Sequence, residues 1–155
     1  MKIVLLERIV SGGQTGVDRA ALHVAIDLGI PHGGWIPAGR RTENGPLPEK
    51  YDLIETETTR YPERTMRNVR DSDATLIVTQ GPATGGTALT IDFTEKLGKS
   101  SLVFDLAEES EPPVIADWLS DQRVSILNVA GPRESTTPGI YDLTFTLLHR
   151  VLRAG

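Results

Sequence analysis

The stretch that decides the fold spans residues 9–20 and reads Ile9-Val10-Ser11-Gly12-Gly13-Gln14-Thr15-Gly16-Val17-Asp18-Arg19-Ala20. Two β-branched residues lead into a turn with three glycines, and an amphipathic helical pattern begins at about Val17. A strand, a glycine turn and a helix in this order direct free backbone N–H groups and the positive helix end toward an anion. The turn therefore predicts a seat for a phosphate-bearing small molecule, formed by Ser11, Gly12, Gly13, Gln14, Thr15 and Gly16.

This first glycine turn differs from the common phosphate-binding motifs. No Lys-Ser or Lys-Thr pair follows it as in a Walker A motif, and it does not match G-x-G-x-x-G. The alternative is a tight strand-to-helix turn without a ligand, although such a turn needs fewer glycines.

Short apolar runs along the chain predict the remaining strands. Continuous β-branched residues at 8–10, 74–79, 101–104 and 124–129 are typical of parallel strands covered on both faces. Helical patterns lie between them, at 17–28, 62–69, 87–97, 112–119 and 139–152. The alternation predicts one α/β domain over residues 1–155, with a Rossmann-like open, mainly parallel sheet flanked by helices. We interpret residues 1–7 as a terminal extension or edge strand and 31–48 as a long functional loop.

A second glycine turn follows the predicted strand 74–79 and reads Gly81-Pro82-Ala83-Thr84-Gly85-Gly86-Thr87. The carboxyl ends of parallel strands meet at one edge of the sheet, so both glycine turns are expected to face one crevice. Thr84, Gly85, Gly86 and Thr87 are therefore predicted to bind the same ligand. Two independent structural turns are the alternative.

The charge and composition exclude several classes of function. A formal net charge of −5 argues against nucleic acid bound over a broad surface, and the absence of cysteine excludes disulfides and thiolate chemistry. No apolar run approaches the ~18 residues that a membrane span needs. The three histidines lack metal-ligand spacing. We expect a cytoplasmic protein with no nucleic-acid partner, membrane contact or metal.

Arginines are concentrated between residues 40 and 70, where six of them lie. The planar guanidinium fork suits phosphate and carboxylate groups. We predict that Arg40, Arg41 and Arg64, together with Arg19 in the first helical turn, contact a small anionic ligand. Solvated, salt-bridged helix faces are the alternative for each arginine. Asp18 could orient a ligand hydroxyl, bind a metal, or complement the helix dipole.

These motifs resemble the putative molybdenum carrier family over nearly the whole chain. The resemblance is carried by residues 11–21, Gly34-Trp35-Ile36-Pro37, Gly39-Arg40-Arg41, Tyr61, Arg64-Thr65, Asn68-Val69, Asp71-Ser72-Asp73 and Thr84-Gly85-Gly86-Thr87. That family is similar in fold to molybdenum cofactor carrier proteins and to lysine-decarboxylase-like (LOG) proteins. The resemblance implies a Rossmann-like sheet, a phosphorylated or nucleotide-like ligand such as molybdenum cofactor, and a homo-oligomer, either a dimer or a tetramer.

The chain departs from the LOG phosphoribohydrolases at their catalytic position. Their Pro-Gly-Gly-x-Gly-Thr-x-x-Glu motif ends in a catalytic glutamate, whereas the corresponding stretch here ends at Thr90. Asp92 and Glu95 are the nearest acids. The departure favours a protein that holds its ligand over one that cleaves it.

Three functions remain open from the sequence. The first is a binding protein for a phosphate-bearing small molecule, such as molybdenum cofactor or a nucleotide. The second is an enzyme that hydrolyses a nucleotide or its phosphoribosyl bond, with Asp18, Asp92 or Glu95 as the catalytic carboxylate. The third is a regulatory module that senses a nucleotide.

Overall fold

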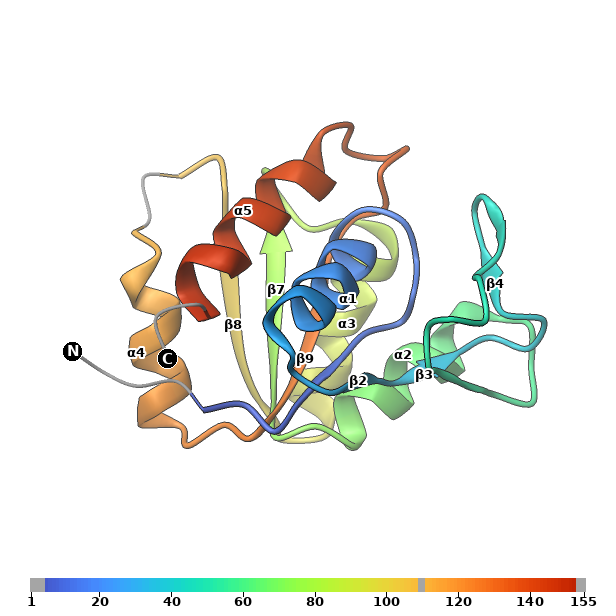
Figure 1. The fold of residues 1–155 in the computed structure, drawn as a ribbon, viewed down its shortest axis with the longest axis horizontal. Coiled ribbons are helices and arrows are strands. Elements are labelled where there is room, and N and C mark those ends of the chain that lie inside the picture. The colour runs from blue at the N-terminus through green and yellow to red at the C-terminus, as the bar shows by residue number, and fades with distance from the viewer. Residues whose placement is uncertain (1–4, 109–110, 153–155) are drawn as a thin grey trace.

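A central sheet of five parallel strands organises the computed structural model, which describes residues 5–108 and 111–152 (Figure 1). From edge to edge the strands are β2 (His32–Gly33), β1 (Arg8–Val10), β9 (Ile126–Ala130), β7 (Ala74–Thr79) and β8 (Ser100–Asp105). The last strand in the chain therefore lies in the middle, paired with both β1 and β7. The predicted α/β, Rossmann-like fold is confirmed.

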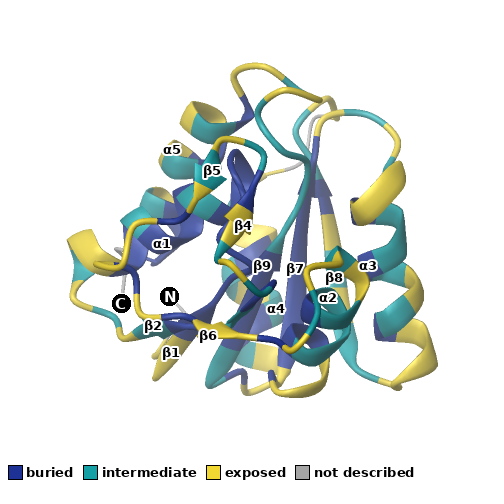
Figure 2. Cartoon of the chain, turned by 90° about the vertical axis from the view of Figure 1, so that its right-hand side faces the viewer, coloured by how far each residue is buried: buried dark blue, intermediate teal, exposed yellow. Residues whose placement is uncertain are grey.

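Helices cover both faces of this sheet (Figure 2). On one face, α1 (Val17–Leu28), α4 (Pro113–Asp121) and α5 (Ile140–Leu152) supply side chains to a common core. On the other face, α2 (Tyr61–Arg70) and α3 (Gly85–Lys96) pack against each other. The arrangement leaves the carboxyl ends of the strands bordered by helices from both layers.

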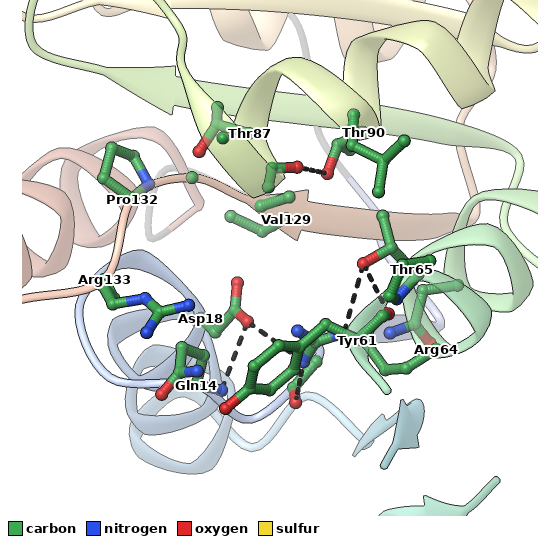
Figure 3. Close-up of a pocket in the computed structure, with 18 of the residues that line it drawn as sticks. Gln14, Asp18, Tyr61, Arg64, Thr65, Thr87, Thr90, Val129, Pro132 and Arg133 are labelled. Carbon is green, nitrogen blue, oxygen red and sulfur yellow. Dashed lines mark hydrogen bonds and ion pairs between the residues drawn. The ribbon is translucent and has the colours of Figure 1, made fainter. Parts of the chain in front are cut away.

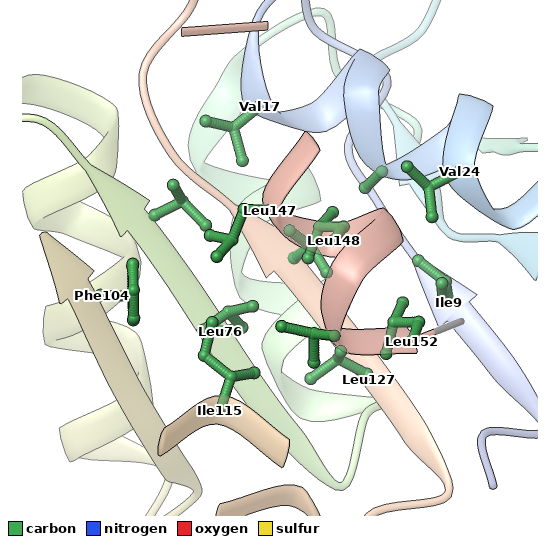
Figure 4. Packing of buried hydrophobic residues seen from close by; sticks show 14 of the residues in the cluster. Ile9, Val17, Val24, Leu76, Phe104, Ile115, Leu127, Leu147, Leu148 and Leu152 are labelled. Carbon is green, nitrogen blue, oxygen red and sulfur yellow. The ribbon is translucent and has the colours of Figure 1, made fainter. Parts of the chain in front are cut away.

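The larger apolar core lies under α1, α4 and α5 (Figure 4). Leu76 of β7 and Leu127 of β9 are fully buried there, against Val24 of α1 and Leu148 of α5. Every residue of β7 is buried, as its continuous apolar run predicts for a central parallel strand. Burial of this apolar surface is the main stabilising contribution to the fold.

The opposite face of β7 and β9 is more polar. Thr75 is fully buried, and the Asn128 side-chain amide donates to its hydroxyl over 3.3 Å. Helix α3 buries three threonines at helical spacing, Thr87, Thr90 and Thr94. A polar layer between the sheet and α3 thus leads toward the carboxyl ends of the strands.

The segment predicted as one long loop, residues 31–48, contains short strands instead. Besides β2, these are β3 (Trp35–Ile36), which pairs in parallel with β6 (Ile54–Glu55), and β4 (Arg41–Thr42), which forms an antiparallel hairpin with β5 (Gly45–Pro46). A second, smaller core holds the segment against α1 and consists of Leu22, Ile36, Leu47, Tyr51 and Leu53. Strands of two residues carry no periodic sequence signal, so the pattern could not show them.

The other predicted elements are present, with shifted boundaries. The helix predicted from Thr87 begins at Gly85, which places the glycine pair in its first turn. Residues 1–4 of the expected terminal extension lie outside the described residues, and residues 5–7 precede β1 without regular structure. No helix within the described ranges is both long and apolar enough to cross a membrane.

Candidate functional site

One pocket of about 390 Å³ opens at the carboxyl ends of β1, β7 and β9 (Figure 3). The sheet forms its floor, with α2 and α3 alongside. Its position agrees with the rule that open α/β sheets bind ligands beyond the carboxyl ends of their strands. The lining residues are Gly12, Gln14, Asp18, Tyr61, Pro62, Arg64, Thr65, Asn68, Thr84, Gly85, Gly86, Thr87, Leu89, Thr90, Asn128, Val129, Ala130, Gly131, Pro132, Arg133 and Thr136.

The second glycine turn presents an open helix N-terminus to this pocket. Gly85 and Gly86 form the start of α3 and are exposed. A Cβ at either position would meet no other atom within 4 Å. The first N–H groups of a helix have no partner within the helix, and the helix dipole makes them favourable for an anion. The α3 N-terminus, which has no acidic residue in its first turn, is therefore suited to bind phosphate.

The first glycine turn is closed by the protein itself. The Gly13 N–H donates to the Ser11 hydroxyl, and the Gln14 N–H donates to the Asp18 carboxylate, each over 3.2 Å. The Thr15 N–H donates to the Gln14 side-chain oxygen over 3.1 Å. Only Gly12 and Gln14 of this turn line the pocket.

Space around the first turn is also filled. A Cβ at Gly13 would lie 2.9 Å from Ile36 Cδ1, and a Cβ at Gly16 would overlap the Pro132 carbonyl. Both glycines have positive φ, 78° and 76°. Glycine is required at these two positions because the backbone is left-handed and its neighbours pack closely. Whether the predicted residues Ser11, Gly13, Thr15 and Gly16 contact a ligand stays a prediction, since they lie outside the pocket lining.

An ion pair in the pocket lining joins α1 to α2. Asp18 Oδ2 lies 3.8 Å from Arg64 Nη1, and both side chains are about nine-tenths buried. The same Arg64 nitrogen donates to the Gly12 carbonyl over 2.6 Å. Burial raises the pKa of Asp18 from 3.8 to about 6, although Arg64 and the Gln14 N–H act to lower it. Burial also lowers the pKa of Arg64, against the attraction of Asp18.

Three guanidinium groups surround Tyr61 at the side of the pocket. The distances from Cζ to the ring centroid are 4.6 Å for Arg41, 5.2 Å for Arg64 and 5.5 Å for Arg133. Arg64 and Arg133 line the pocket, so its charged side chains are two cations and the single carboxylate of Asp18. This balance favours an anionic ligand in a protein whose net charge is −5.

Other arginines singled out from the sequence hold the protein together. The Arg40 guanidinium donates to four backbone carbonyls of the segment after β5, those of Leu47, Pro48, Tyr51 and Leu53. Arg19 donates to the Gly13 carbonyl over 3.3 Å. Neither residue lines the pocket, and Arg41 approaches it only through Tyr61. Their predicted contact with a ligand stays a prediction.

The three candidate carboxylates occupy different positions. Asp18 lines the pocket, whereas Asp92 and Glu95 are exposed on α3 outside the lining. Within the described ranges, no group of three or more His, Asp or Glu residues is arranged to hold a metal ion.

Sequence reasoning missed two parts of the pocket. One is the segment after β9, which supplies Gly131, Pro132, Arg133 and Thr136. The other consists of Tyr61, Pro62 and Thr65 of α2, which lie beside the predicted Arg64. The Gly131-Pro132-Arg133 sequence, directly after a buried strand, is the signal that could have revealed the first part, because this is where ligands bind in parallel sheets.

Comparisons with known proteins agree with this geometry. Residues 9–152 match the Circularly permutated YpsA SLOG family. The crystal structure of a putative molybdenum carrier protein from Syntrophus aciditrophicus SB is 44% identical in sequence, with a TM-score of 0.90 over 96% of each chain. This similarity confirms the predicted resemblance. No curated protein matches the chain.

Proposed function

The chain belongs to the circularly permutated YpsA SLOG family, and on that premise we propose that it is a binding protein for a phosphate-bearing small molecule. The observation that carries this proposal is the exposed N-terminus of α3 at the pocket, with Gly85 and Gly86 in its first turn. The 44% identical neighbour named as a putative molybdenum carrier supports a carrier role. Molybdenum cofactor and a nucleotide are the two ligand classes that we propose.

The charges of the pocket support the same assignment. The α3 N-terminus offers a partial positive charge, and Arg64 and Arg133 add two full ones. Its volume of about 390 Å³ falls within the ~300–1,000 Å³ typical of small-molecule sites. The pocket therefore has the size and the charge for one phosphorylated small molecule.

A substitution at Gly86 tests the proposal. The backbone there is not left-handed and the added side chain enters open space, so Gly86→Asp is expected to fold normally. A carboxylate in the first turn also suits the helix dipole, so the melting temperature should not fall. The same carboxylate would repel a phosphate, and we expect binding of inorganic phosphate and of AMP, measured by calorimetry, to be lost.

Gly86→Asn is the matched control, because it adds a side chain of the same size without the charge. It should retain more of the binding than Gly86→Asp. Equal affinity of the Gly86→Asp variant and the wild-type protein for both probes would refute the seat at α3. Failure of the wild-type protein to bind any phosphate-bearing probe, including a pterin phosphate, would refute the proposed function.

A second candidate function is hydrolysis of a nucleotide or its phosphoribosyl bond. One observation favours it: Asp18 is a buried pocket carboxylate with a pKa of about 6, which suits a general acid or base near neutral pH. Incubation of the pure protein with nucleoside monophosphates, followed by chromatography for the free base, distinguishes the two. Binding without release of base would leave the carrier as the function.

We also propose that the protein forms a homo-oligomer, a dimer or a tetramer. The proposal rests on the resemblance of the sequence to the putative molybdenum carrier family, which implies a homo-oligomer. Light scattering coupled to size-exclusion chromatography tests it, and a mass of one chain at micromolar concentration would overturn it.

A further inference from the structure

We propose that the pocket selects phosphate esters that carry a sugar hydroxyl, and that Asp18 accepts the hydrogen bond from that hydroxyl. The inference rests on the proposed function, because it concerns the same pocket. It adds the chemical class of the part of the ligand that is not phosphate, and it assigns a specificity-determining residue.

The two oxygens of the Asp18 carboxylate have different surroundings. Oδ2 accepts the Gln14 N–H and faces Arg64. Oδ1 has no hydrogen-bond partner in the part of the chain that the structure describes. Figure 3 shows the carboxylate of Asp18 directed into the cavity, with Arg133 to one side of it. A ligand in the pocket therefore meets a hydrogen-bond acceptor whose cavity side is open.

The surrounding charges determine which donor fits this oxygen. Arg64 on α2, Arg19 on α1 and Arg133 after β9 are the cations near Asp18, and the Gln14 N–H also faces it. A ligand ammonium group would meet these cations, and a second anion would meet the carboxylate itself. A neutral hydroxyl avoids both penalties and satisfies the buried acceptor. The pocket is also much larger than phosphate alone, which leaves room for a sugar.

Protonation of Asp18 gives the inference a distinct signature. Burial holds its pKa at about 6, so the group is partly protonated at pH 6. A hydroxyl that donates to the carboxylate stabilises the charged form, which lowers the pKa and releases protons on binding. A phosphate that only approaches Asp18 would raise the pKa and cause proton uptake. The phosphate group itself titrates near pH 6, so the proton transfer by Asp18 is measured as the difference from a variant that lacks this carboxylate.

The experiment is calorimetry at pH 6 in two buffers that differ in ionisation enthalpy. The probes are inorganic phosphate, n-butyl phosphate, which lacks a hydroxyl on its chain, and ribose 5-phosphate. We expect ribose 5-phosphate to bind wild-type protein about tenfold more tightly than n-butyl phosphate, as one hydrogen bond to a charged group provides. Every probe also titrates near pH 6 through its own phosphate group. The contribution of Asp18 is therefore the difference between proteins, and wild-type protein should release more protons with ribose 5-phosphate than Asp18→Asn does.

Asp18→Asn replaces the charged acceptor with a neutral group of the same shape. The advantage of ribose 5-phosphate should shrink about fivefold in this variant, while n-butyl phosphate should bind at least as well as before. Asp92→Asn, which removes a charge on the exposed side of α3, is the control and should leave every affinity unchanged.

The outcomes separate this inference from the proposed function. Equal binding of ribose 5-phosphate and n-butyl phosphate by wild-type protein would overturn the role of Asp18 and leave phosphate binding intact. The same holds if wild-type protein releases no more protons with ribose 5-phosphate than Asp18→Asn does. If a pterin phosphate without a hydroxyl binds more tightly than ribose 5-phosphate, a ring N–H of the ligand is the donor to Asp18 Oδ1. This result would also overturn the inference. Absence of binding by all probes would refute both proposals. If Asp18→Asn does not fold, the ratio of the affinities of wild-type protein for ribose 5-phosphate and n-butyl phosphate decides alone.

Discussion

Replacing Asp18 by asparagine should stabilise the ligand-free protein at neutral pH, although the change breaks a buried ion pair. Asp18 is 7% exposed, and burial raises its pKa from 3.8 to about 6 despite the nearby Arg64. One pKa unit corresponds to ~1.36 kcal/mol, so ionised Asp18 lowers the free energy of unfolding by about 3 kcal/mol at pH 7. Asparagine resembles the protonated carboxyl group and does not carry this cost.

The sign of the pH dependence follows from the two pKa values. Well below pH 3.8 the group is protonated in both the folded and the unfolded chain, so it costs no free energy of unfolding. As the pH rises from about 4 through 6, Asp18 ionises in the unfolded chain before it ionises in the folded protein. The free energy of unfolding of the wild-type protein therefore falls over this range. The free energy of unfolding of Asp18→Asn should therefore approach that of the wild-type protein near pH 3 and exceed it by up to about 3 kcal/mol above pH 7.

Urea unfolding at several pH values between 4 and 8, followed by tryptophan fluorescence, measures this difference. Trp35 and Trp118 supply the signal. Asp92→Asn controls for the loss of one negative charge at an exposed site. A destabilised Asp18→Asn protein at pH 7, or a difference from wild type that does not change with pH, would refute the reasoning.

Two further substitutions test the closed first turn. Gly13→Ala should lower the free energy of unfolding by about 1–3 kcal/mol, because the backbone has a φ of 78° and the new Cβ would lie 2.9 Å from Ile36 Cδ1. Thermal unfolding measures this loss. Gly86→Ala is the control, and its free energy of unfolding should change little because the new Cβ enters open space. Glu43→Gln should loosen the β4–β5 hairpin, since hydrogen bonds from the hydroxyls of Ser135 and Thr15 hold this carboxylate and lower its pKa although burial acts to raise it. Limited proteolysis should cut residues 41–46 of that variant faster than those of the wild-type protein. An unchanged rate would show that the contacts of Glu43 with Ser135 and Thr15 do not hold the hairpin.

Local sequence was sufficient for four of the five strands of the central sheet and for the helices. The run from Ala74 to Thr79 is apolar or β-branched without alternation, and it forms the fully buried central strand that such a run predicts. The stripe on α1 and the glycine at its end likewise predicted the helix boundaries, and Gly29 caps it with a φ of 70°. These features depend on residues close together in the chain, so periodicity reports them.

Strand β2 and the two small sheets between residues 35 and 55 could not be predicted in the same way. Strands of two residues are held by long-range contacts, such as Arg40 with the carbonyls after β5 and Ile36 with Leu22 of α1. Neither contact leaves a periodic pattern. The pocket residues Tyr61 and Arg133 were missed for the same reason, because they reach the pocket from segments about 70 residues apart.

The opening motif shows where the limit lies. Its sequence by itself determined a strand, a glycine turn and a helix, because only glycine tolerates the left-handed backbone at Gly13 and Gly16. The tertiary structure decided which helix N-terminus is open. At the first turn, Asp18 and the chain after β9 take the N–H groups that an anion would use, whereas Gly85 and Gly86 of α3 lie exposed at the pocket. Two turns of similar sequence differ because long-range packing closes one and leaves the other accessible.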